Sequence, residues 1–260
     1  MNKIAEVFAK EKKVFIPFIT AGDPSLEITE EMIYAMEKAG AGIIEIGIPF
    51  SDPVAEGPVI QAADLRALQA GCKTDKIFAM LKKVRQNTQV PLVFLTYINP
   101  IFTYGCDKFF KNCQECGISG VIVPDVPFEE KGEIAQYCKQ YDVNLISLIA
   151  PTSEQRIKMI AKEAAGYIYL VSSLGVTGVR TTITTDITAI VEQIRQVTKV
   201  PIAVGFGIAT PEQANKMAAI SDGAIVGSAI VKIVEESGTN CVKPVADYVR
   251  VMTAAVKACI

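Results

Sequence analysis

Short apolar segments recur along the chain at fairly even spacing. Each is almost continuously apolar, as expected for parallel strands that are covered on both faces. The segments between them place apolar residues at helical spacing, and several end in glycine near the expected helix terminus. We predict strands in residues 14–20, 42–48, 91–97, 120–125, 143–150, 166–172, 200–207 and 221–228, and helices in residues 26–40, 74–86, 108–117, 129–141, 154–166, 188–199 and 211–220.

Eight alternations of strand and helix predict an α/β fold of the (β/α)8 type, a TIM barrel. No linker or low-complexity stretch divides residues 1–260, so we expect a single domain. A short amphipathic helix is expected at about residues 2–11, with Ile4, Val7 and Phe8 on one face. The main alternative is a doubly wound open sheet, but no G-x-G-x-x-G follows the first predicted strand.

Composition narrows the range of partners and compartments. Half of the residues are hydrophobic, yet no apolar run reaches the ~18–20 residues that span a bilayer. The net charge is −2 and no long basic run is present, which makes nucleic acid and membrane surfaces poor partners. The first residues lack the apolar region of a secretory signal. We therefore expect a cytoplasmic protein.

The chain has seven cysteines and no histidine. An odd number of cysteines without a signal segment is typical of reduced thiols in a cytoplasm. Cys113 and Cys116 form a C-x-x-C pair, but a structural zinc would need further ligands, and we expect no metal. Without histidine, general acid–base catalysis must use carboxylates, tyrosine, lysine or thiol.

Two glutamates lie where a barrel carries its chemistry, at the C-terminal end of a strand and in the following loop. Glu45 interrupts the apolar run IIEIGI, and Glu56 lies in the loop PFSDPVAEGP, which three prolines stiffen. A carboxyl group inside a strand is costly unless it is paired or functional. Glu45 is thus either a structural, hydrogen-bonded residue or a catalytic acid–base group with a raised pKa.

The loops after the last three predicted strands are rich in glycine. They contain Gly178, Gly205, Gly207, Gly227 and Ser228. Barrels often bind phosphate with the loops after strands 7 and 8 and with the N-terminus of a short helix. We therefore expect a phosphorylated ligand here.

Six stretches in chain order resemble the α subunit of tryptophan synthase: PFITAGDPS, IEIGIPFSDPVAEGPVIQAA, VPDVPFEE, SSLGVTGVR, VGFGIATPEQ and GSAIVKI. The resemblance implies a lyase of tryptophan biosynthesis that cleaves indole-3-glycerol phosphate by a retro-aldol step to indole and glyceraldehyde 3-phosphate. It also implies no cofactor or metal in this chain. The expected partner is a β subunit that carries pyridoxal phosphate, in an α2β2 heterotetramer.

The resemblance assigns roles to individual residues. Glu45 matches the catalytic glutamate that transfers protons at C3 of the indole ring and at the glycerol hydroxyl. Glu56 matches an aspartate that faces the indole N–H. The remaining matches are an indole pocket of Phe18, Leu95, Tyr97 and Tyr169, a loop-closing Thr177, and a phosphate site of Gly178, Gly207, Gly227 and Ser228. The helix after Pro53, residues 100–104 and residues 125–127 resemble the face that docks the β subunit.

Glu56 is where the chain departs from the family pattern, which reads ADGP where this chain reads AEGP. A carboxylate one methylene longer in a stiff loop predicts a working but slowed lyase. An alternative is a weak or inactive subunit that mainly binds and activates a β subunit. Two other phosphate-binding barrels fit less well: a ribulose-phosphate epimerase would want metal-binding histidines, and an indole-glycerol-phosphate synthase would want a lysine inside a strand.

Overall fold

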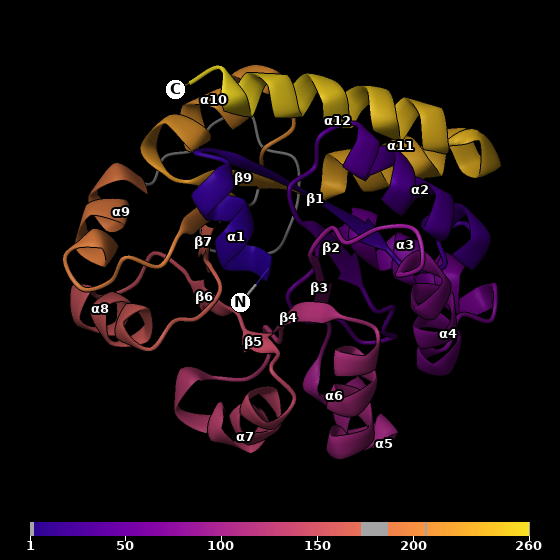
Figure 1. The fold of residues 1–260 in the computed structure, drawn as a ribbon, viewed down its shortest axis with the longest axis horizontal. Helices are drawn as coiled ribbons and strands as arrows, with labels where there is room; N and C mark the ends of the chain where they lie inside the picture. Colours follow the sequence, from indigo (N-terminus) through magenta and orange to yellow (C-terminus); the bar gives the residue numbers. More distant parts are fainter. Residues whose placement is uncertain (1–2, 173–186, 206, 260) are drawn as a thin grey trace.

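A computed structural model describes residues 3–172, 187–205 and 207–259, which form a nearly closed barrel of parallel strands surrounded by helices (Figure 1). The order around the described sheet is β5-β4-β3-β2-β1-β9-β8-β7-β6. The predicted (β/α)8 barrel is therefore confirmed. The strands are β1 (Val14–Thr20), β2 (Ile44–Gly47), β3 (Leu92–Leu95), β4 (Ile118–Ile122), β5 (Asn144–Leu145), β6 (Ser147–Ile149), β7 (Ile168–Val171), β8 (Ile202–Gly205) and β9 (Gly223–Val226).

The fifth predicted strand, residues 143–150, is divided into β5 and β6. β5 pairs with β4, whereas β6 pairs with β7, so the strand changes neighbour at Ile146. The Ile146 side chain occupies the space beside two glycines, because a Cβ on Gly120 or Gly166 would lie 3.1 Å or 2.8 Å from its Cδ1. The Ile146 N–H still donates to the Val121 carbonyl at 2.9 Å, which keeps the barrel wall joined across the break.

Helices surround the barrel, one at its end and the others on its outside (Figure 1). They are α1 (Lys3–Lys10), α2 (Leu26–Lys38), α3 (Pro58–Gln69), α4 (Thr74–Val84), α5 (Ile98–Tyr104), α6 (Cys106–Glu115), α7 (Gly132–Gln140), α8 (Glu154–Lys162), α9 (Ile187–Arg195), α10 (Pro211–Ile220), α11 (Ser228–Ser237) and α12 (Val242–Lys257), with 3-10 turns η1 (Phe128–Glu130) and η2 (Gly238–Asn240). The pattern did not lead us to predict α12, although Val245, Val249, Met252 and Val256 form its buried stripe. None of the helices described is long and apolar enough to cross a membrane.

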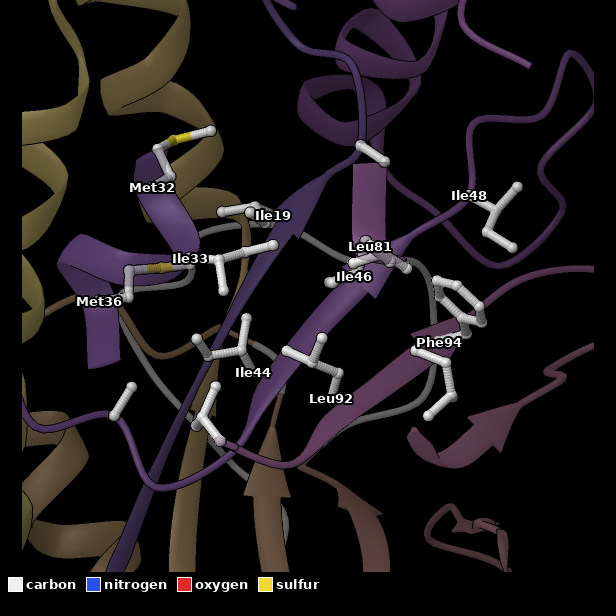
Figure 2. Close-up of a cluster of buried hydrophobic side chains, with 14 of the residues drawn as sticks. Ile19, Met32, Ile33, Met36, Ile44, Ile46, Ile48, Leu81, Leu92 and Phe94 are labelled. Atoms are coloured by element: carbon white, nitrogen blue, oxygen red, sulfur yellow. The ribbon is translucent and has the colours of Figure 1, made fainter. Parts of the chain in front are cut away.

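Apolar side chains pack in two layers, one outside the strands and one inside. In the outer layer, Figure 2 shows Met32, Ile33 and Met36 of α2 beside Ile44 and Ile46 of β2. These helix positions recur at helical spacing and form a stripe that is buried against the sheet.

The inner layer fills the barrel, and α1 contributes to it. Ile4 is fully buried in a cluster with Val14, Ile43 and Tyr167, and the rings of Phe8 and Tyr167 are 6.3 Å apart. Figure 1 shows α1 over the middle of the ring of strands. The N-terminal helix thus covers one end of the barrel, and the other end is left for a ligand site.

Candidate active site

A pocket lies at the end of the barrel where the strands have their C-termini. It receives side chains from β1, β2, β3 and β7, from the loop between β2 and α3, and from the segments after β8 and β9. Every predicted site residue that the structure describes lines this pocket: Phe18, Glu45, Glu56, Leu95, Tyr97, Tyr169, Gly207, Gly227 and Ser228. Thr177 and Gly178 lie outside the described residues.

The pocket wall is mainly apolar and includes residues that we did not predict. These are Ala55, Ile60, Ile122, Pro124, Leu148, Ile208 and Ile225. Ile122, Leu148 and Ile225 lie on strands, where the two-residue period would have placed them inside the barrel; the other four lie in loops or in α3. Such walls fit a flat aromatic group and limit the access of water to it.

Glu45 lies in the middle of this apolar surface. It pairs in register with Phe18 of β1 and Val93 of β3, and its side chain is only 1% exposed. The Tyr167 hydroxyl donates to its Oε1 at 2.5 Å, while Oε2 has no hydrogen-bond partner among the described residues. Burial raises the pKa of Glu45 to about 8, against a smaller lowering by the Tyr167 hydrogen bond. The group is therefore held in place by one oxygen and can exchange a proton with the other near neutral pH.

Tyr167 is a site residue that we missed. It precedes β7 and lies two residues before Tyr169, so strand periodicity places both phenols on one face. Its contact with Glu45 joins positions far apart in the chain and leaves no mark in the sequence. Tyr169 has room in the pocket because its ring lies against Gly205 of β8, where a Cβ would lie 2.5 Å from the Tyr169 hydroxyl.

The loop between β2 and α3 folds Glu56 down into the pocket. Glu56 is buried, and the Gln61 side chain donates to its backbone carbonyl at 2.7 Å. The Tyr97 hydroxyl accepts the Ala55 N–H at 3.2 Å and is hydrogen-bonded to the Glu56 carboxylate. Burial raises the pKa of Glu56, and hydrogen bonds from Asp64 and Tyr97 oppose that rise. Oε2 of Glu56 has no partner within the described residues and remains available to a ligand.

A helix N-terminus forms the third part of the pocket. α10 begins with a capping box in which Thr210 and Gln213 satisfy free N–H groups, whereas the N-cap of α11 is Gly227, which has no side chain to provide a cap. Gly227 and Ser228 line the pocket. An uncapped N-terminus has free N–H donors and a partial positive charge, and both favour an anion such as phosphate.

Gly207 offers a test of this anion site, because it lines the pocket with φ +76°. We expect Gly207→Val to weaken the binding of glyceraldehyde 3-phosphate or inorganic phosphate by roughly 10- to 100-fold, the loss of one or two hydrogen bonds to a charged group. Indole binding should change much less. Isothermal titration with each ligand measures both effects.

Gly71→Val is the matched control, since Gly71 has φ +77° but lies away from the pocket. The Gly71 variant introduces the same backbone strain away from the pocket, so it should leave the affinities for phosphate and indole unchanged. Equal weakening of phosphate and indole in the Gly207 variant would place the anion site elsewhere.

The barrel and its pocket define a class of protein: a (β/α)8 barrel that places buried carboxyl groups in an apolar pocket beside a helix N-terminus. The family model of the tryptophan synthase alpha chain matches residues 4–257, and this chain belongs to that family. It is 49% identical over 258 residues to the tryptophan synthase alpha chain of Lacticaseibacillus casei, covering 99% of this chain and 97% of the relative.

Solved structures agree with this assignment. The tryptophan synthase alpha chain of Legionella pneumophila superposes with a TM-score of 0.88 at 35% identity, covering 98% of this chain and 97% of that one. A chain of the tryptophan synthase complex of Pyrococcus furiosus superposes with a TM-score of 0.84 at 31% identity, covering 94% and 99%. The activity of the family is that of a lyase in tryptophan biosynthesis, and the family needs no cofactor in the α subunit.

Proposed function

We propose that this chain cleaves indole-3-glycerol phosphate to indole and glyceraldehyde 3-phosphate as the α subunit of tryptophan synthase. The observation that carries the proposal is Glu45, a buried carboxyl group with a pKa of about 8 and one oxygen open to an apolar pocket. Such a group is protonated in part at neutral pH and can act first as an acid and then as a base.

Glu45 alone can carry out both proton transfers of the reaction. The protonated carboxyl delivers its proton to C3 of the indole ring, which turns the ring into an indolenine cation. The carboxylate then takes the proton of the glycerol hydroxyl, the bond from C3 to the glycerol carbon breaks, and its electron pair restores the aromatic ring. Glu45 ends in the protonation state in which it began.

Two other parts of the pocket support this sequence of steps. The unpartnered oxygen of Glu56 would face the ring nitrogen, where positive charge develops, and a fixed counter-charge stabilises that cation. Gly207 and the N-terminus of α11 would hold the phosphate. Closure by Thr177 and phosphate binding by Gly178, as the family resemblance implies, remain part of the proposal and concern residues that the structure does not describe.

We further propose a β subunit as the partner, docked on the face around the mouth of the barrel. Three apolar side chains are exposed there: Val54 (72%) in the β2–α3 loop, Leu65 (56%) in α3 and Phe102 (47%) in α5. The Asp125 carboxylate accepts the Ile98 N–H at 3.1 Å, which joins the loop after β4 to the start of α5. Because these segments also carry the active-site loops, docking would act directly on catalysis.

A cytoplasmic location is also proposed. All seven cysteines are free, and Cys72, Cys113, Cys116, Cys138 and Cys241 are buried. Free thiols in these numbers are typical of a reducing compartment.

The test of the proposed function is indole release from indole-3-glycerol phosphate, measured for the chain alone and with a β subunit. We expect slow release by the chain alone and faster release in the complex. Absence of release under both conditions would reject the lyase proposal and favour the alternative of a subunit that only activates its partner, for which neither the site nor the comparisons give support.

A further inference from the structure

Asp64 is an acidic residue in an apolar position. The buried stripe of α3 consists of Ile60, Ala63, Asp64 and Ala67, which follow the helical spacing of a core face. Asp64 is only 3% exposed. A carboxyl group costs several kcal/mol there unless a partner compensates it, so its presence calls for a partner.

That partner is Glu56. The two carboxyl groups are hydrogen-bonded to each other, and Asp64 also accepts the backbone N–H of Phe50. Two carboxyl groups can share a hydrogen bond only when one of them carries a proton, because an ionised carboxylate has no donor. Asp64 thereby connects the start of the β2–α3 loop to Glu56 near its end.

The surroundings of the pair favour Asp64 as the member that carries the proton. Burial, and next the negative charge of Glu56, raise the pKa of Asp64 to about 9. Glu56 is better suited to be the ionised member, because the Tyr97 hydroxyl donates to it as well. A single negative charge on the pair would then lie on Glu56, the residue that lines the pocket.

The surrounding charges leave this arrangement intact. Asp23, which faces Asp64, is engaged by Arg66 through two hydrogen bonds of 2.9 Å and 2.8 Å. Arg66 also contacts Glu235 of α11 at 3.1 Å. Its charge is thus shared by two carboxylates. Tyr97 contributes its hydroxyl, and burial raises the pKa of that phenol, so it stays neutral.

We propose, on the basis of the lyase function above, that Asp64 is a positioning residue that donates its carboxyl proton to Glu56 and aims the free oxygen of Glu56 at the cationic ring of the intermediate. Glutamate has one more rotatable bond than aspartate, so its tip needs such a fixed partner. Oε1 and Oε2 of Glu56 then have different tasks: one is anchored and the other faces the ligand.

Asp64→Leu and Asp64→Asn form a matched pair for testing this proposal. Leucine fills a similar volume without a donor, and a misplaced carboxylate should lower kcat for indole release by roughly 10- to 100-fold, with a much smaller change in KM. The amide of Asn can still donate to Glu56, so Asp64→Asn should retain kcat within about threefold of the wild type at neutral pH. Asp75→Asn, on the exposed surface of α4, controls for the substitution itself.

Glu56→Asp examines the same contact from the other side. It withdraws the carboxylate by about 1.5 Å, one methylene, from Asp64. The sequence alone predicted a misplaced Glu56, but a Glu56 seated by Asp64 is in place, so we expect slower indole release from the variant; misplacement of about 1 Å can cost 100-fold. A several-fold gain instead would show that Glu56 is out of place in the wild type and that Asp64 does not seat it, which would overturn the proposal.

A measurement independent of activity is the titration of Glu56, followed by NMR with 13C-labelled glutamate carboxyls and assigned with Glu56→Gln. Coupled groups titrate in two steps that belong to the pair, so the wild type should show two steps and Asp64→Asn one. Identical titrations in both proteins would overturn the pairing.

If the wild type shows the two steps but releases no indole, the lyase function fails while the pairing stands. If the Leu variant only loses stability and keeps kcat, Asp64 is merely structural.

Discussion

Glu45→Gln is expected to reduce indole release by about 10²- to 10⁴-fold, the usual contribution of a general acid–base group. Glutamine keeps the shape of the side chain and can still accept the hydrogen bond from Tyr167, but it cannot deliver a proton to C3 of the indole ring. Binding of glyceraldehyde 3-phosphate should be unchanged, because the proposed anion site lies on other elements. Single-turnover release of indole and titration with the phosphate ligand measure the two effects.

Tyr167→Phe is the companion variant. It removes the donor that holds Oε1 of Glu45 but leaves the acid, so we expect a loss of no more than about 10-fold, on the scale of one hydrogen bond to a charged group. A Glu45→Gln variant that retains most of its activity would make Glu45 a structural residue.

Folding stability is expected to fall with rising pH because of the same residue. The pKa of Glu45 is about 8 in the folded chain and 4.5 as the ordinary value. The folded state thus binds the proton more tightly, so the stabilisation is complete below pH 4.5 and is lost as the pH rises to about 8. At most this amounts to about 5 kcal/mol in the free energy of unfolding.

Glu45→Gln should remove this pH dependence. We expect the variant to gain stability over the wild type as the pH increases from 5 to 8.5, measured as the difference between their urea unfolding free energies. Asp64, whose pKa is also raised, contributes a similar slope in both proteins and cancels in that difference. A difference that stays constant with pH would mean that the Glu45 carboxyl is not shifted in the folded chain.

Much of the fold followed from the apolar segments, because parallel barrel strands are buried on both faces and stand out as continuous runs. The division at Ile146 did not, since the Ile146 side chain lies beside two glycines, Gly120 on β4 and Gly166 just before β7. Glu45 could be found because an acid is conspicuous within a run of isoleucines.

Tyr167 and Asp64 were not identified as site residues from the sequence, for different reasons. The partner of Tyr167 is 122 positions away, and only the closed barrel brings the two together. Asp64 did leave a signal, an acid at an apolar position of α3. We overlooked that signal because Glu56, in the loop just before the helix, already explained why this segment carries an acid.

The helix at the opposite end of the barrel has a consequence for the chemistry. Ile4 and Phe8 of α1 pack beneath Tyr167, which in turn holds Glu45. They shield Glu45 from bulk solvent at the end of the barrel opposite the pocket. The proton affinity of Glu45 depends on that insulation, because dehydration is what favours its neutral form. The apolar residues of α1 thus help to keep the pKa of Glu45 high, although they lie at the end of the barrel opposite the pocket.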